Sequence, residues 1–124
     1  MDVTDPEDVG QAIDKILDDS GGLNGIIHSA GVIMDNYLVN KSAAELTSVL
    51  EPKVKGMINL DQATRSLDLD FMALFSSMTA EFGNIGQADY AAANAFLDEY
   101  SEYRNSLVSA GERKGITVSI NWPL

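Results

Sequence analysis

A short apolar run at residues 71–75 constrains the fold of this chain more than any other feature. It reads Phe-Met-Ala-Leu-Phe, with acidic residues before it and two serines after it. A run this short, without alternating polar residues, is typical of a strand buried on both faces of a parallel sheet. We therefore predict that Ser76 and Ser77 lie at the carboxyl end of a strand, where open α/β sheets bind ligands.

The segment after these serines predicts a loop followed by a helix. Gly83 and Gly86 permit sharp turns, and from about Gln87 the chain is rich in alanine, a strong helix former. Tyr90 and Asn94 are four residues apart, so they share one face of that helix. A tyrosine that faces a strand-end serine can act as a proton donor. The alternative is structural, because a helical tyrosine often belongs to the core with its hydroxyl in water.

Two further segments are predicted as strands. Residues 24–31 contain Ile26 and Ile27 and end in a small-small-glycine exit, and residues 116–120 alternate apolar and polar side chains. Helical segments separate the three strands, so the order is βαβαβ. Right-handed crossovers then give a doubly wound parallel sheet of the α/β class.

Capping residues mark where two of the helices begin. Asp5 or Thr4 caps a helix that starts at Pro6 and ends at a pair of glycines. Residues 42–45 form a capping box, which starts a long helix. Pro52 cannot supply a helical amide, so we expect it to kink or interrupt that helix.

Composition excludes several classes of function. The 124 residues carry a formal charge of −11, so we expect no binding to nucleic acid or to an anionic membrane, whose phosphates need lysine and arginine. The chain has no cysteine and one histidine, and therefore no metal site is predicted. That histidine, His28, is expected to be packed rather than catalytic. The start has no basic leader and no apolar run is long enough to span a membrane, so a cytoplasmic protein is expected.

Ser77, Tyr90 and Asn94 also carry a resemblance to a known family. A serine, a tyrosine thirteen residues later and an asparagine four residues after that resemble the active-site signature of the short-chain dehydrogenase/reductase superfamily. The resemblance is closer to the ketoreductase domains of modular polyketide synthases, which take their lysine from an earlier helix in a Lys-Val-x-Gly context. Lys53 begins such a stretch here. From the residues alone Lys55 remains a rival, and a solvated lysine is the common role for either.

The resemblance implies a nicotinamide cofactor and the residues that contact it. An Asp-Val pair in the position of residues 2–3 lines the adenine pocket in the resembling family, although Asp2 can equally be a solvated acid near a chain end. The small-small-glycine exit at residues 29–31 lets the backbone approach a flat ligand closely. The implied cofactor-binding residues are Asp2, Val3, Ala30, Gly31, Lys53 and Tyr90.

Two positions are implicated in stereocontrol by the same resemblance. Asp35 matches the last aspartate of the Leu-Asp-Asp motif that marks B-type ketoreductases, although Ile-Met precedes it here. Phe82 stands where A-type domains carry tryptophan. B-type domains often have proline two residues after the tyrosine, and Ala92 departs from that pattern. We therefore predict B-type stereochemistry, with an ordinary loop acid as the alternative for Asp35.

The resemblance further implies that residues 1–124 are the catalytic half of a ketoreductase domain, with no internal domain boundary. The expected fold is Rossmann-like, but the glycine-rich βαβ half with its G-x-G-x-x-G motif has no counterpart here. The sheet is therefore incomplete, and the strand at Ile26 and Ile27 is left as an apolar edge. We expect the chain to be inactive without the missing N-terminal half, which other parts of a synthase would supply.

The implied reaction is NADPH-dependent reduction of a β-ketoacyl thioester on an acyl carrier protein. Tyr90 would donate the proton, Ser77 would hydrogen-bond the developing alkoxide, and Asn94 would orient the network or its water. A phenol has a pKa of about 10, and the ammonium of Lys53 would lower it by stabilising the phenolate. Two alternatives stay open. One is a stand-alone reductase of the same superfamily that acts on a small ketone, and the other is an inactive structural half-domain.

Overall fold

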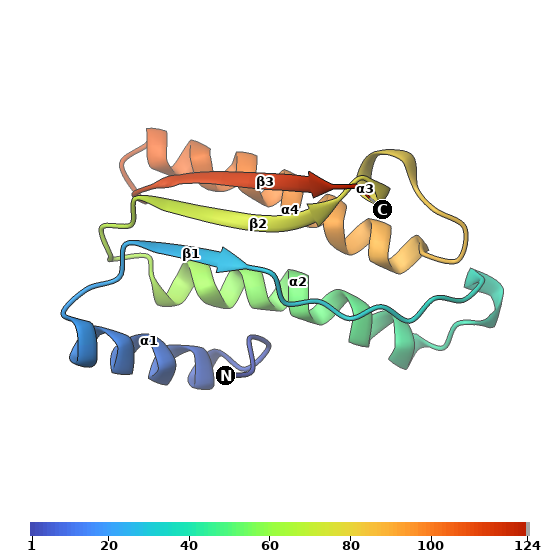
Figure 1. The fold of residues 1–124 in the computed structure, drawn as a ribbon, viewed down its shortest axis with the longest axis horizontal. Coiled ribbons are helices and arrows are strands. Elements are labelled where there is room, and N and C mark those ends of the chain that lie inside the picture. Colours follow the sequence, from blue (N-terminus) through green and yellow to red (C-terminus); the bar gives the residue numbers. More distant parts are fainter. Residues whose placement is uncertain (124) are drawn as a thin grey trace.

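The computed structural model describes residues 1–123 and contains a three-stranded parallel sheet with helices packed against it (Figure 1). The predicted βαβαβ order is confirmed. No helix in residues 1–123 combines the length and apolarity needed to cross a membrane. In chain order the elements are α1 (Pro6–Ser20), β1 (Gly25–His28), η1 (Leu38–Asn40), α2 (Ala43–Ala63), β2 (Phe71–Ser77), α3 (Thr79–Phe82), α4 (Ala88–Ser109) and β3 (Ile116–Trp122).

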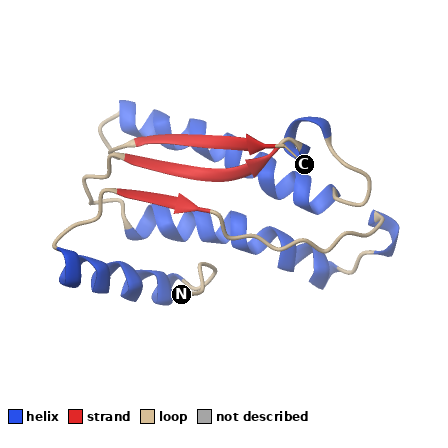
Figure 2. Ribbon diagram, viewed as in Figure 1, coloured by secondary structure: helices blue, strands red, loops and turns tan. Residues whose placement is uncertain are grey.

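The strand order is β1-β2-β3, with every neighbouring pair parallel. Ile26 pairs with Met72 at one side of the central strand, and Phe75 pairs with Ile120 at the other. Both crossovers step in the same direction, so right-handed connections place α2 and α4 on the same face of the sheet. All three strands therefore end at one edge, toward which the arrows in Figures 1 and 2 point.

The two faces of the sheet differ in burial. On the helix-covered face the strands meet α1, α2 and α4 in one core, which includes Val9, Ile13, Ile26, Met57, Leu60, Met72, Leu74 and Leu97. On the opposite face Ile27 is 62% exposed and Ile116 is 60% exposed. The predicted incomplete, Rossmann-like sheet is confirmed, with helices on one face and bare apolar side chains on the other.

The caps decide where the helices begin and end. Asp5, rather than Thr4, is the N-cap of α1, because its carboxylate accepts the amide of Glu7 at 2.9 Å. Gly21 ends this helix in the left-handed region, at φ 73°. The predicted capping box at the start of α2 is also confirmed, with Ser42 and Glu45 bonded reciprocally.

Two features differ from the sequence-based expectation. Of the two outcomes expected at Pro52, a kink or an interruption, the interruption does not occur, because α2 continues through it. Proline removes one backbone hydrogen bond, and burial of the neighbouring turns, at Val49 and Lys53, holds the helix together. The segment predicted as a loop after β2 contains one helical turn, α3, which Gly83 ends with a φ of 67°.

Candidate active site

A cleft of about 270 Å³ opens where β2 and β3 end. We call it the main cleft. Its walls come from five parts of the chain: the loop after β1, helix α2, the ends of β2 and β3, and the first turn of α4. The lining residues are Ser29, Gly31, Ile33, Lys53, Phe75, Ser76, Ser77, Tyr90, Trp122 and Pro123. Three predicted catalytic residues, Ser77, Tyr90 and Lys53, thus meet in one cavity.

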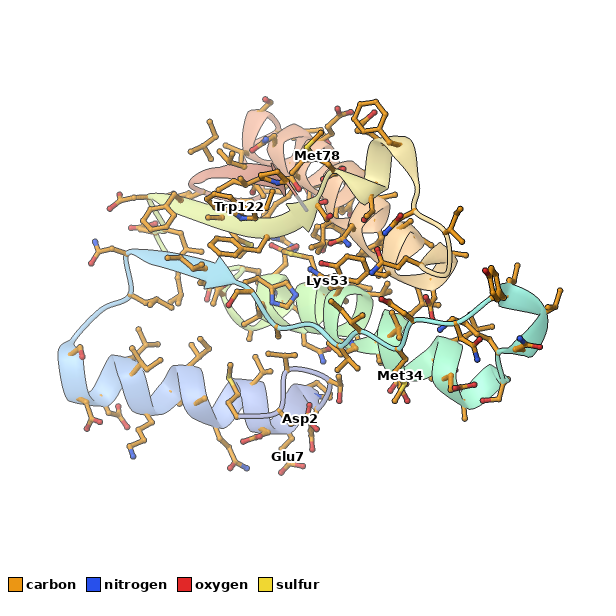
Figure 3. The ribbon with its side chains drawn as sticks, turned by 45° about the vertical axis from the view of Figure 1, so that its right-hand side comes forward. Asp2, Glu7, Met34, Lys53, Met78 and Trp122 are labelled. Atoms are coloured by element: carbon orange, nitrogen blue, oxygen red, sulfur yellow. The ribbon has the colours of Figure 1, made fainter. Side chains whose placement is uncertain are left out.

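Lys53 is the buried cation of the main cleft. Its ammonium donates to the carbonyl of Phe75 at 2.5 Å and lies 5.9 Å from the centre of the Tyr90 ring. Figure 3 shows it rising from α2 beneath the strands. Burial lowers the pKa of Lys53 to about 8, against the opposing effect of Asp98. The rival Lys55 instead points into solvent and pairs with Glu51 on the same helix.

The two serines at the end of β2 point to opposite faces, as neighbouring strand residues do. Ser76 donates its hydroxyl to the backbone carbonyl of Asn94 at 3.1 Å, which ties the strand to α4. The Ser77 oxygen accepts the amide of Thr79 at 3.2 Å. Since this bond uses a lone pair, the hydroxyl proton of Ser77 remains able to donate to an acceptor in the main cleft.

Asn94 lies below Tyr90 on α4 and is fully buried. Its amide nitrogen donates to the carbonyl of Tyr90 at 2.9 Å. Its side-chain oxygen has no hydrogen-bond partner among residues 1–123. A buried acceptor without a partner is expensive, and an ordered water beside it would satisfy it.

The predicted stereocontrol residues lie outside the lining of the main cleft. The carboxylate of Asp35 accepts the side-chain amide of Gln87 at 3.0 and 3.1 Å, three residues before Tyr90. Phe82 is 79% exposed and borders a separate small hollow with Met78. Asp35 therefore lies on the loop after β1 and Phe82 at the end of α3, both outside the lining of the main cleft.

The predicted cofactor residues divide between two hollows. Gly31, Lys53 and Tyr90 line the main cleft, whereas Val3 and Ala30 line a mostly apolar hollow of about 390 Å³ beside β1. Ser29 borders both, so the two hollows adjoin. A side chain at Gly31 would come within 3.2 Å of Lys53, so glycine keeps this wall flat.

Neither Asp2 nor His28 lines the main cleft. Asp2 lines neither hollow, and its carboxylate accepts the amide and hydroxyl of Thr4, which lowers its pKa. Figure 3 shows it beside the start of α1. His28 is buried, as expected, and burial lowers its pKa to about 4, so it is neutral near pH 7.

Two parts of the site were not predicted. The rings of Phe75 and Trp122 lie 5.3 Å apart and form an aromatic wall of the main cleft. No local pattern signals this wall, because the two rings meet only through the register of β2 and β3, in which Ser77 pairs with Trp122. Asp98 on α4 accepts the hydroxyl of Ser119 and the amide of Asn121, and it places a negative charge near Lys53.

A comparison with family models identifies the family of the chain. The model of the KR domain matches residues 1–124. Polyketide synthase PksN of Bacillus subtilis (strain 168) is 57% identical over 124 residues, which are 100% of this chain and 2% of PksN. The chain belongs to the KR domain family. The resemblance to the ketoreductase domains of polyketide synthases is thus confirmed.

Solved structures agree with this assignment. A crystal structure of a ketoreductase domain from the bacillaene assembly line matches with a TM-score of 0.97 and 46% identity, over 99% of this chain and 30% of that one. A short-chain dehydrogenase from Streptomyces avermitilis shares the fold, with a TM-score of 0.85 at 22% identity, over 98% of this chain and 45% of that one. The ketoreductase chain therefore spans under a third of the bacillaene domain.

Ketoreductases of this superfamily use nicotinamide cofactors, and the residues present fit part of such a group. The flat wall at Gly31 suits the nicotinamide ring, and the buried donor Lys53 suits a ribose hydroxyl. The adjoining hollow extends the available volume along β1. No glycine-rich phosphate loop occurs in the sequence. In the described part of the chain no group of three acidic or histidine side chains is placed to hold a metal.

Proposed function

We propose that this ketoreductase chain is the catalytic half of a domain that reduces a β-ketoacyl thioester, carried on an acyl carrier protein, with NADPH. The observation that carries the proposal is the meeting of Ser77, Tyr90 and Lys53 in one cleft at the carboxyl ends of the strands. These side chains supply a hydrogen-bond donor, a proton donor and a buried positive charge. A carbonyl reduction needs all three, because negative charge develops on the oxygen.

Tyr90 and Ser77 act on the ketone oxygen in this proposal. As the carbonyl carbon is reduced, its π electrons move to oxygen, the Ser77 hydroxyl donates to the developing alkoxide, and Tyr90 transfers its proton to give the alcohol. NADPH, when bound, supplies the hydride and is oxidised to NADP⁺. The free hydroxyl proton of Ser77 supports its role, since its oxygen already accepts from Thr79.

Lys53 and Asn94 support the proton donor. The Lys53 ammonium, 5.9 Å from the Tyr90 ring, stabilises the phenolate left after proton transfer. A second role proposed for this ammonium is to hold the nicotinamide ribose, and its bond to the Phe75 carbonyl supports that role by fixing it in the main cleft. The unpartnered oxygen of Asn94 is suited to hold a water that returns a proton to Tyr90.

Asp35 and Phe82 are proposed to govern which face of the ketone is presented, with B-type stereochemistry as the outcome. Support comes from their position, because Asp35 lies on the loop after β1 and is bound to Gln87 just before Tyr90, and Phe82 ends the helical turn α3 that follows β2. Because neither side chain lines the main cleft, each would act by positioning the residues that do.

A second polypeptide segment is proposed to complete the fold. The face of the sheet opposite the helices exposes Ile27, Ile116 and Val118, and the outer edge of β1 has no neighbouring strand within residues 1–123. A glycine-rich half that adds strands beyond β1 and helices on this face would bury both, and would bring the phosphate-binding loop.

The proposal is tested with the chain alone and with a joined domain. The joined domain is the bacillaene ketoreductase in which this chain replaces the matching segment, a graft that 46% identity and a TM-score of 0.97 favour. Loss of NADPH absorbance is followed with a 3-oxoacyl thioester of a small thiol, and again with the same acyl group on an acyl carrier protein. The configuration of the alcohol is determined by chiral chromatography.

We expect turnover in the joined domain only, faster with the carrier-bound substrate, and a B-type alcohol. A joined domain that folds and binds NADPH but reduces no thioester would contradict the proposed function. Faster reduction of a small free ketone than of any thioester would instead favour the stand-alone reductase.

A further inference from the structure

A buried ion pair joins the loop after β1 to the start of α4. The ammonium of Lys41 lies 2.8 Å from one carboxylate oxygen of Asp89. The contact is an ion pair without hydrogen-bond geometry, and the two side chains are 0% and 1% exposed. Lys41 also donates to the carbonyl of Met34, which Figure 3 labels on this loop. The other oxygen of Asp89 accepts the backbone amide of Tyr90 at 2.8 Å. The pair is thus bonded directly to the backbone of the proposed proton donor.

The pair carries a cost that a surface pair would not. Taking two charges out of water is unfavourable, and the attraction between them offsets that penalty only when the geometry is good and other hydrogen bonds are made. Asp89 also lies in the first turn of α4, where the helix dipole favours a carboxylate even without a lysine. We therefore attribute the burial of Lys41 to structural specificity rather than to stability. The ion pair fixes how the loop sits against α4, a role that buried polar pairs can serve.

Two other contacts fasten the same loop to the same turn. The amide of Asn36 donates to the carbonyl of Gly86 at 3.0 Å, and Gln87 binds the Asp35 carboxylate. Residues 31–40 are otherwise exposed along their whole length. The loop is thus held against residues 86–89, immediately before Tyr90, by polar contacts rather than by apolar packing.

We propose that Lys41 and Asp89 are positioning residues, which set the place of Tyr90 and of the loop bearing Asp35 relative to the main cleft. This inference rests on the proposed function. Neither side chain lines the cleft, so the pair acts through the Tyr90 backbone and the loop. A misplacement of about 1 Å at a reacting group can lower a rate by about 10²-fold, so a rigid link at this point matters for turnover.

The test uses the joined domain with single and paired substitutions. Asp89→Asn keeps the shape and an acceptor for the Tyr90 amide, Lys41→Met removes the other charge, and a third variant carries both. The matched control removes the exposed pair of α2, with Glu51→Gln and Lys55→Met, whose side chains are 33% and 57% exposed. Each kcat is expressed per NADPH-binding site, so that unfolded protein does not enter the comparison.

We expect each single substitution to lower kcat roughly 10- to 100-fold, with little change in the Kd for NADPH. Less selective formation of the alcohol is also expected, because the loop and Tyr90 would no longer move as one unit. The double variant should lose no more than the worse single variant, since the pair acts together. Lys41→Arg should restore most of the rate, and the control should match the parent.

A second readout does not depend on turnover. Hydrogen exchange followed by mass spectrometry should show faster exchange at residues 33–41 and 86–91 in Asp89→Asn and unchanged exchange there in the control. If Asp89→Asn keeps the parent kcat, product ratio and exchange, the inference is wrong while the proposed function stands. An unsubstituted joined domain that binds NADPH without reducing any thioester would overturn both.

Discussion

The two ends of α4 hold buried polar groups in opposite states. At the carboxyl end Arg104 is 1% exposed, and it donates to Asp61, to the carbonyls of Gly115 and Lys114, and to the hydroxyl of Thr117. At the amino end Asn94, Asp89 and nearby Thr79 each leave a buried oxygen without a hydrogen-bond partner in the described chain. The comparison teaches that one end is saturated and serves stability, whereas the other leaves polar atoms and the buried Lys53 available for chemistry.

The largest expected effect is at the amino end. In the joined domain Tyr90→Phe should lower kcat by about 10²- to 10⁴-fold, the range that general acid catalysis contributes. Its NADPH affinity and urea midpoint should stay near those of the parent, because Tyr90 is only partly buried, in the wall of the main cleft, and the phenyl ring is kept. Stopped-flow absorbance and titration of NADPH fluorescence measure the two quantities. Undiminished turnover would show that Tyr90 is not the proton donor.

The next effect is at the carboxyl end, and it concerns stability alone. Arg104→Met removes the main partner of buried Asp61 and should lower the free energy of unfolding by roughly 3 kcal/mol. This is the low end of the cost of breaking a buried ion pair, because Arg113 still lies 3.0 Å from Asp61. Urea unfolding measures it, with kcat per NADPH site unchanged. As a control, Lys114→Met breaks the exposed pair with Asp68 and should change stability by under about 0.5 kcal/mol. A large fall in kcat for Arg104→Met would contradict the view that the carboxyl end of α4 serves stability alone.

The third effect is a pH dependence that arises from Lys53. With a pKa of about 8, Lys53 loses its charge as pH rises past that value, so kcat should fall about tenfold per pH unit above it. Lys53→Arg stays charged, and any activity it retains should be flat in this range. A parent profile that is flat to pH 10 would show that the Lys53 charge is not needed.

The same group affects stability with a definite sign. The folded pKa of Lys53, about 8, lies below its ordinary value of 10.5, so the unfolded chain binds more protons between these values. Stability should therefore rise by about 1–3 kcal/mol from pH 8 to 10.5 through this group. Comparing the parent with Lys53→Met isolates the contribution, and Lys55→Met serves as the exposed control.

The smallest expected effect is at the loops beside the amino end. Asp35→Ala breaks the contact with Gln87 and should change the ratio of the two alcohols more than the rate, which should fall only a few-fold, since one polar contact is worth about 1 kcal/mol. Chiral chromatography of the product gives the ratio. An unaltered ratio would remove Asp35 from stereocontrol.

Local signals predicted most of the elements. The apolar run at residues 71–75, the alternation at 116–120 and the capping box at Ser42 each depend on neighbours only a few residues away, and the structure confirms all three. The βαβαβ order then follows from connections of constant hand. The family motif named Ser77 and Tyr90. A short motif can capture both, because they belong to one consecutive strand, loop and helix.

The sequence by itself determined the elements, their order and the family; the tertiary structure decided which side chains meet. The choice between Lys53 and Lys55 stayed open because the expected kink or break at Pro52 would have changed where both side chains point. The structure keeps α2 continuous, so Lys53 shares the buried face of Val49 and Met57, four residues to either side, and Lys55 stays in water. The pair of Lys41 and Asp89 had no local signal, since it forms only when the loop after β1 closes onto α4. Contacts between distant segments are set by the packing of the whole chain, and a pattern read over a few residues contains no record of them.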